Sequence, residues 1–134
     1  MAHGSRRRHR ALARQGGQGS EITAQLRPDA DDYFVLKPMH SAFYATPLEI
    51  LLRHLHVRRV IVVGVTADQC VFLTPAGARM RDFDVRVPSD AVASQAQRRT
   101  ELALEQVESS LQIVTGECAG IDLSASGSPG PASA

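Results

Sequence analysis

The sequence predicts an α/β fold, in which an open parallel sheet carries helices on both of its faces. Residues 60–65 (VIVVGV) are apolar throughout and rich in β-branched side chains, which is typical of a strand buried on both faces of a parallel sheet. Leucines at positions 48, 51, 52 and 55 form a single apolar stripe on a helix. Between residues 21 and 123, short apolar runs alternate with amphipathic stretches, which is the order expected of α/β units.

The first expected strand and helix follow one another closely. The apolar run 33–36 predicts a strand that ends at Lys37, because the next residue is a proline and has no N–H to donate. Thr46 is suited to cap the helix that carries the leucine stripe, since a proline follows it at the first helical position. Glu49 would complete a capping box with Thr46.

The second helix begins directly after the buried strand 60–65. A turn at residues 66–69 leads to Cys70, and the helix that starts there extends to about Met80. Asp68 is interpreted as the cap of this helix. Residues 84–87 then predict the third strand.

One more helix and strand complete the expected domain. Residues 96–109 predict a helix that turns Leu102, Val107 and Leu111 inward, and residues 111–115 predict a last short strand. The expected count is four strands alternating with three helices.

Low-complexity segments flank this domain. A chain of 134 residues has room for one domain, to which we assign residues 21–123. Residues 1–20 are rich in arginine, glycine and glutamine and predict a disordered tail; residues 124–134 (SASGSPGPASA) predict another.

Charge and composition exclude several classes of protein. The formal net charge of +1 gives no strong preference for nucleic acid or for a membrane, and the longest apolar run is too short to span a bilayer. The five arginines within residues 1–14 have no aromatic neighbour that could stack on a base, and no apolar core of a secretory signal accompanies them. Two cysteines without paired spacing argue against a disulfide framework and favour a cytoplasmic location.

Lys37 is the only lysine among fifteen basic residues. In a chain that otherwise uses arginine, a retained lysine indicates a position where a compact ammonium group is needed and a wide guanidinium is unsuitable. A surface lysine that has survived by chance remains an equal alternative at this point.

Three segments of interest follow predicted strands. Lys37, residues 66–70 and Ser89-Asp90 each come at the carboxyl end of a strand, and ligands of open α/β sheets bind at that edge. Cys70 also begins a helix, where free N–H groups favour an anion and hence a thiolate. A buried structural cysteine is the other interpretation of this residue.

Five short motifs of this chain resemble those of the isochorismatase-like cysteine hydrolases. They are Lys37-Pro38, residues 40–43 (HSAF), residues 46–48 (TPL), residues 64–71 (GVTADQCV) and residues 87–91 (VPSDA), and they occur in the family's order and spacing. The resemblance implies a Rossmann-like three-layer fold and identifies Cys70 with the family's nucleophile. The family includes nicotinamidases and other amidohydrolases, as well as isochorismatase, which cleaves a vinyl ether.

The resemblance also implies a mechanism. For the amidases, a thiolate attacks a carbonyl and water hydrolyses the resulting thioester. Carried over to this chain, Cys70 attacks, Lys37 holds the thiolate, and the backbone N–H groups of Thr66 and Cys70 form the oxyanion hole. A cis peptide is expected at Val65-Thr66, and Phe43 and Val65 are expected to line the pocket of a small-molecule substrate. A homo-oligomer is possible, and no cofactor is expected.

The family's third catalytic residue is an aspartate in a D-x-Q segment, and this chain has no such segment. Asp29, Asp31 and Asp32 precede the first predicted strand and should lie at the opposite edge of the sheet. We therefore expect a chain that lacks the family's first strands, with unpaired strand edges and with no general base for Cys70. The histidines at positions 40, 54 and 56 show no ligand spacing, and no metal is expected.

Two functions remain open from the sequence. The first is a cysteine hydrolase of a small amide or related C–N bond. The second is a catalytically inert, truncated member of the family that serves only as an interaction partner or fragment. A phosphate-binding α/β domain is disfavoured, because residues 64–69 (GVTADQ) lack the glycines that such a loop needs.

Overall fold

The computed structural model describes residues 19–123, so residues 1–18 of the predicted tail 1–20 and the whole predicted tail 124–134 lie outside the described residues. Ser20, the last residue assigned to the first tail, begins a helix. The chain divides into two units, Met1–Phe34 and Val35–Ala134. In the first unit, the described part contains one short helix, α2 (Ser20–Gln25), which has no buried residue. Everything that bears on the predicted site belongs to the second unit.

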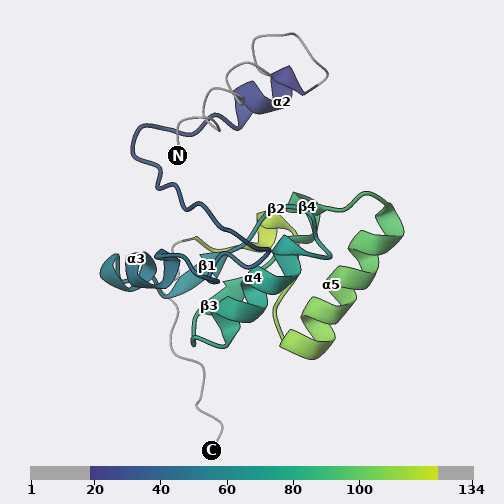
Figure 1. Ribbon diagram of the computed structural model, residues 1–134. Helices are drawn as coiled ribbons and strands as arrows, with labels where there is room; N and C mark the ends of the chain where they lie inside the picture. Colours follow the sequence, from purple (N-terminus) through teal and green to yellow (C-terminus); the bar gives the residue numbers. More distant parts are fainter. Residues whose placement is uncertain (1–18, 124–134) are drawn as a thin grey trace, which may run out of the picture. The chain divides into compact units, whose positions relative to one another are not determined.

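The second unit alternates helices with short parallel strands (Figure 1). Its elements are α3 (Leu48–His54), β1 (Arg59–Ile61), β2 (Gly64–Val65), α4 (Cys70–Arg79), β3 (Asp84–Arg86), the 3-10 turn η1 (Ser89–Ala91), β4 (Val92–Ala93), α5 (Gln97–Leu111) and the 3-10 turn η2 (Cys118–Gly120). β1 pairs with β3 and β2 pairs with β4, both in parallel. The predicted parallel α/β class is therefore confirmed.

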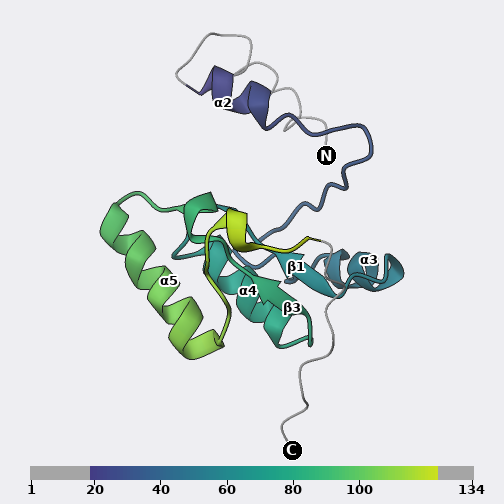
Figure 2. The same ribbon diagram turned by 180° about the vertical axis from the view of Figure 1, so that it is seen from behind.

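The core of this unit lies around α4. Both views place α3 and α5 at opposite ends, with α4 and the β1–β3 pair between them (Figures 1 and 2). Its cluster of buried side chains draws on α4, β3, α5 and the segment before α3, and comprises Phe43, Val71, Ala78, Phe83, Val85, Val87, Val107 and Ile113. Burial of these apolar side chains is the main term that holds the elements together.

The first predicted strand is absent. Residues 33–36 are irregular, and Tyr33, Phe34 and Leu36 are each at least 65% exposed. A strand needs a neighbour for its ladder of hydrogen bonds. Within residues 19–123 no strand pairs with this segment, and none pairs with the second edge of β1, so the expected unpaired edge is present.

The predicted strand 60–65 is divided into two. β1 ends at Ile61 and β2 begins at Gly64, whose φ of +106° is accessible to glycine and strained for other residues. The chain changes partner there, from β3 to β4. The segment 60–65 is also less buried than predicted, since Val63 is 56% exposed. The two-residue β4 was not predicted.

Two further predictions near the C-terminus need correction. On α5 the buried stripe is Thr100, Ala103 and Val107, whereas Leu102 is 43% exposed and does not point inward. The helix runs to Leu111, and the last predicted strand is reduced to a single parallel bridge between Arg86 and Val114.

The capping box predicted for α3 does not form. Thr46 Oγ1 does accept a hydrogen bond from Leu48 N at 3.3 Å, but the Glu49 carboxylate binds Arg53 and Arg81 instead. Glu49 therefore binds Arg53 on the same helix and the distant Arg81, and does not bond back to Thr46.

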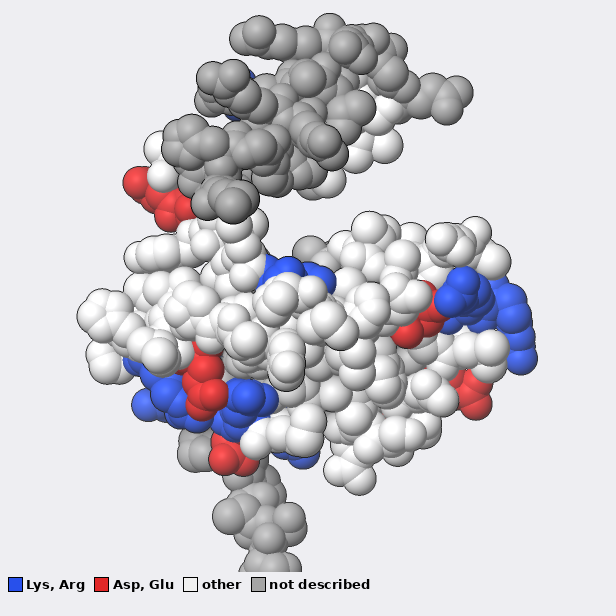
Figure 3. Space-filling model, viewed as in Figure 1, with Lys and Arg blue, Asp and Glu red and all other residues white. Residues whose placement is uncertain are grey.

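Charged side chains of both signs adjoin one another on the surface. On the face in Figure 3, blue and red atoms meet in mixed groups rather than forming a field of one sign. Ion pairs such as Arg53–Glu49 and Arg98–Glu101 join side chains of opposite sign. No helix in the described part of the chain combines the length and the apolar character needed to cross a membrane.

Candidate functional site

Cys70 is the first residue of α4, as predicted, and is half-buried. The residue before it, Gln69, makes no side-chain capping bond to the helix. Val71 N donates to Thr66 O at 3.2 Å, whereas Cys70 N has no described acceptor and carries the partial positive charge of the helix terminus. An anionic sulfur is favoured in such a place.

Lys37 lies against Cys70, although 33 positions separate them in the sequence. Lys37 Nζ is 3.2 Å from Cys70 Sγ and also donates to the carbonyl oxygen of Met39 at 3.1 Å. The predicted meeting of the solitary lysine with this thiol is thus present. An ammonium at hydrogen-bonding distance stabilises a thiolate.

His40 is a second partner of the same sulfur and was not among the site residues predicted from the sequence. Its Nδ1 lies 3.7 Å from Cys70 Sγ, within hydrogen-bonding range for sulfur. Which of the two atoms donates depends on the imidazole tautomer. The signal that could have found it is its place three residues after Lys37 and directly before the Ser41-Ala42-Phe43 motif.

One face of α4 holds the segment that carries these partners. Cys70, Thr74 and Gly77 are spaced i, i+4 and i+7, so they share a face of the helix. Thr74 Oγ1 accepts a hydrogen bond from Ala42 N at 3.0 Å. The segment from Lys37 to Phe43 therefore follows this face of α4 along its length.

Gly77 is where the segment comes closest to the helix. A Cβ built at Gly77 would lie 3.1 Å from Phe43 Cδ2 and 3.3 Å from Ser41 Oγ. A larger residue would therefore push the segment away from α4. The ring of Phe43 is 7% exposed and belongs to the core, with its centroid 6.2 Å from that of Phe83.

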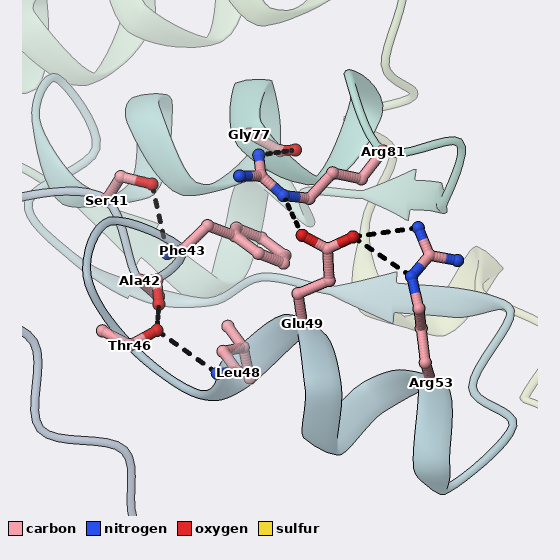
Figure 4. Close-up of polar contacts among 9 residues, drawn as sticks. All are labelled: Ser41, Ala42, Phe43, Thr46, Leu48, Glu49, Arg53, Gly77 and Arg81. Carbon is pink, nitrogen blue, oxygen red and sulfur yellow. Dashed lines mark hydrogen bonds and ion pairs between the residues drawn. The ribbon is translucent and has the colours of Figure 1, made fainter.

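A cluster of charged side chains covers Phe43 (Figure 4). The Arg81 guanidinium lies 4.8 Å from the ring centroid, and Arg81 Nε binds Glu49 Oε2 at 2.7 Å. The hydrogen bond from Arg81, followed by that from Arg53, holds the pKa of Glu49 below its ordinary value. The cluster links α3 to the turn that follows α4, beside the buried ring, which gives Phe43 a structural role. The predicted place of Phe43 in a substrate pocket stays a prediction.

The turn before Cys70 has the predicted backbone. The Val65-Thr66 peptide is cis, which confirms that expectation, and Val65 is 69% exposed. Within residues 19–123, neither Thr66 N nor Cys70 N has a hydrogen-bond acceptor. Thr66 Oγ1 is buried and has no partner among these residues. Two backbone donors are thus free at the position predicted for an oxyanion hole.

Asp68 is not the cap of α4. Its carboxylate accepts a hydrogen bond from Ser94 Oγ at 2.9 Å and forms an ion pair with Arg99, so it joins the turn to the start of α5. Burial raises the pKa of Asp68, but the bonds from Ser94 and its own backbone, together with the charge of Arg99, outweigh burial and leave the pKa below its ordinary value.

The Ser89-Asp90 segment has no described contact with Cys70. Asp90 Oδ1 accepts a hydrogen bond from Cys118 N at 2.8 Å, and this bond is the first cause of the lowered pKa of Asp90. The same carboxylate raises the pKa of the Cys118 thiol. The third predicted segment therefore binds the η2 turn. Among residues 19–123, no group of three or more histidine, cysteine, aspartate and glutamate side chains could hold a metal ion.

Comparison with known proteins relates this geometry to a family. The model of the isochorismatase domain matches residues 2–117. The chain is 38% identical over 102 residues to the uncharacterized isochorismatase family protein YaaI of Bacillus subtilis, a match that covers 75% of the chain and 56% of YaaI. This chain thus spans little more than half the length of that relative.

Solved structures agree with the sequence comparison. The nicotinamidase SaPncA from Staphylococcus aureus is similar with a TM-score of 0.63 and 30% identity, over 74% of this chain and 64% of that one. N-carbamoylsarcosine amidase from Thermoplasma acidophilum is similar with a TM-score of 0.66 and 30% identity, over 82% of this chain and 62% of that one.

Proposed function

Because this chain belongs to the isochorismatase domain family, we propose that it hydrolyses a C–N bond of a small amide through a thioester on Cys70. The observation that carries the proposal is the 3.2 Å contact between Lys37 Nζ and Cys70 Sγ at the first residue of α4. A positive charge at the sulfur and the start of a helix both favour the thiolate, which is the reactive form of cysteine.

The named relatives support an amide substrate. Two of the similar structures are named for action on nicotinamide and on N-carbamoylsarcosine. Both names describe small molecules that contain a C–N bond to a carbonyl carbon. The chain's own substrate is therefore proposed to be a small amide of this kind.

The residues would divide the reaction as follows. Cys70 Sγ attacks the carbonyl carbon, and the free N–H groups of Thr66 and Cys70 donate to the oxygen that becomes negative. The C–N bond breaks, the amine leaves with a proton, and the acyl group remains on Cys70 as a thioester. Water then adds to the thioester, and the acid leaves as the Cys70 thiol forms again. Lys37 stabilises the sulfur anion before the attack, and the negative charge that develops on the sulfur as the acid leaves.

Hydrolysis of a panel of small amides that includes nicotinamide and N-carbamoylsarcosine tests the proposal. Ammonia release should exceed background with the unaltered chain and with Cys118→Ser, and should fall to background with Cys70→Ala. The Cys118→Ser variant is the matched control, because Cys118 is the other cysteine of the chain and is exposed.

Equal rates for the unaltered chain and Cys70→Ala across the panel would overturn the proposal. That result would favour the second candidate, a catalytically inert member of the family. The observation behind this candidate is that, among residues 19–123, the ionisable side chains in contact with Cys70 Sγ are Lys37 and His40, so no described carboxylate reaches the thiol.

A further inference from the structure

We propose that His40 is the residue that moves the proton at this site, taking it from the Cys70 thiol and later giving it to the leaving amine. The inference rests on the proposed function and adds a catalytic residue to it. Its basis is the 3.7 Å distance between His40 Nδ1 and Cys70 Sγ. This is the reach of a sulfur–nitrogen hydrogen bond, which a general base needs in order to act on the thiol.

Lys37, the other ionisable side chain at the sulfur, cannot take the proton from the thiol. Protonated Lys37 has three donors and no lone pair, and it already donates to Cys70 Sγ and to Met39 O. Lys37 therefore stabilises the thiolate once it exists. A neutral imidazole has one nitrogen with a free lone pair, and His40 presents such a ring nitrogen to the sulfur.

The carboxylate nearest to Cys70 in the sequence is also engaged elsewhere. Asp68 is two residues from the nucleophile, but its oxygens bind Ser94 Oγ and Arg99. Within residues 19–123, the ionisable side chains in contact with Cys70 Sγ are Lys37 and His40. His40 is thus the described group that can both accept and return a proton.

The backbone next to His40 is fixed to the helix that carries the thiol. Ala42 N binds Thr74 Oγ1 at 3.0 Å, and Phe43 is buried in the core. These anchors lie two and three residues after His40, on the same face of α4 as Cys70. These anchors, two and three residues from His40 in the chain, therefore keep the imidazole near the sulfur.

His40 alone can accept and return the proton in both halves of the cycle. Nδ1 takes the thiol proton, the resulting thiolate forms the S–C bond, and the imidazolium gives this proton to the nitrogen as the C–N bond breaks. Neutral His40 then takes a proton from water as the water oxygen adds to the thioester, and returns it to the sulfur as the acid leaves. No oxidant, reductant or metal enters the cycle.

Alkylation of Cys70 by iodoacetamide tests the inference without a substrate. The rate is measured from pH 6 to pH 10 in the Cys118→Ser background, so that Cys70 is the one thiol that reacts. With His40→Asn the rate at pH 6.5 should fall about tenfold, because the imidazole no longer removes the thiol proton. At pH 10 the two rates should converge, since hydroxide then removes the proton in either protein.

The matched control is His56→Asn. His56 is exposed and has a φ of +54°, a backbone conformation that asparagine tolerates well. This control should leave the rate at pH 6.5 unchanged. Equal rates at pH 6.5 for His40→Asn and its parent would overturn the inference.

Turnover separates the inference from the proposed function. On an amide that the panel identifies, His40→Asn should lower kcat by about 10²- to 10⁴-fold, the usual share of a general acid–base group, with little change in KM. If no amide is hydrolysed, the proposed function fails, and the alkylation experiment still decides whether His40 takes the thiol proton. An unchanged kcat with His40→Asn on a hydrolysed amide would overturn the inference alone.

Discussion

Helix α4 faces two regions that are held to it in different ways. On one side lie β3 and α5, and Val85 on β3, Val87 directly after it and Val107 on α5 are at most 3% exposed. On the other side lies the segment from Lys37 to Thr46, in which Phe43 is the one deeply buried side chain and Lys37 and His40 are exposed. The first region is fixed by apolar packing along its length, and the second by one ring and a few hydrogen bonds.

The difference separates the two tasks of the site. The packed region fixes the start of α4 and with it the position of Cys70. The anchored segment brings Lys37 and His40 to the sulfur, and loops placed on a rigid scaffold commonly carry the groups that do the chemistry. Loss of an anchor should therefore change the reactivity of Cys70, whereas an equal loss in the packed region should change stability alone.

Phe43→Ala should have the largest effect, because Phe43 belongs to both regions. Removing a buried phenyl ring typically costs about 3–5 kcal/mol of unfolding free energy. Urea unfolding should show this loss, and Cys70 should alkylate at pH 6.5 no faster than an ordinary thiol. Tyr44→Ala is the control: Tyr44 is the next residue and 62% exposed, so it should lose less than about 0.5 kcal/mol. A similar loss in both variants would contradict the anchoring role of Phe43.

Thr74→Val and Thr100→Val compare the two regions directly. Each threonine is under 10% exposed and accepts one backbone N–H through Oγ1, from Ala42 at 3.0 Å and from Ser94 at 2.9 Å. Both substitutions should cost about 1 kcal/mol in urea unfolding, since each leaves a backbone donor without its partner.

Reactivity should distinguish these two variants. Thr74→Val removes one anchor of the segment that carries His40. Alkylation of Cys70 at pH 6.5 should therefore slow about threefold, less than the roughly tenfold fall expected for His40→Asn. Thr100→Val should leave the rate unchanged. If both variants slow alkylation equally, the segment is not an independently held region.

The same contrast explains which features the sequence could reveal. Local patterns predicted α3, α4 and α5, the position of Cys70 at a helix start, and β3, because periodicity and turn residues act within a few positions. The pairing of Lys37 with Cys70 was predicted from two strand ends and from the family resemblance. The pairing is present although the strand expected to end at Lys37 is absent, so the resemblance was the sounder basis. The cis peptide at Val65-Thr66 came from the family resemblance.

The features that sequence reasoning missed depend on distant partners. Residues 33–36 have the composition of a strand but no neighbouring strand in the described chain. Asp68 and Glu49 have the positions of capping residues, yet their carboxylates form ion pairs with the arginines at 99 and 81. His40 lies in a predicted motif, but its contact with the thiol depends on the packing of its segment against α4, where Ala42 N binds Thr74 Oγ1 and Phe43 is buried.

Glu49→Gln should have the smallest effect and a defined pH dependence. The Arg81 hydrogen bond lowers the pKa of Glu49 below its ordinary value of 4.5, so the folded protein binds fewer protons at this group than the unfolded chain does. The stabilisation is therefore complete above pH 4.5 and is lost as the pH falls through the lower folded pKa. Water and salt screen the ion pair, because Arg81 and Glu49 are 34% and 37% exposed.

Urea midpoints measured from pH 7 to pH 3 test this expectation. Glu49→Gln should lower the midpoint at pH 7, and its difference from the unaltered chain should shrink below pH 4.5 as protonation removes the same charge. Glu105→Gln, on the exposed side of α5, should follow the unaltered chain at every pH. Alkylation of Cys70 should change little in Glu49→Gln, because Phe43 and Thr74 still hold the segment. A slowing as large as that of Thr74→Val would show that Arg81, through Phe43, helps to place His40.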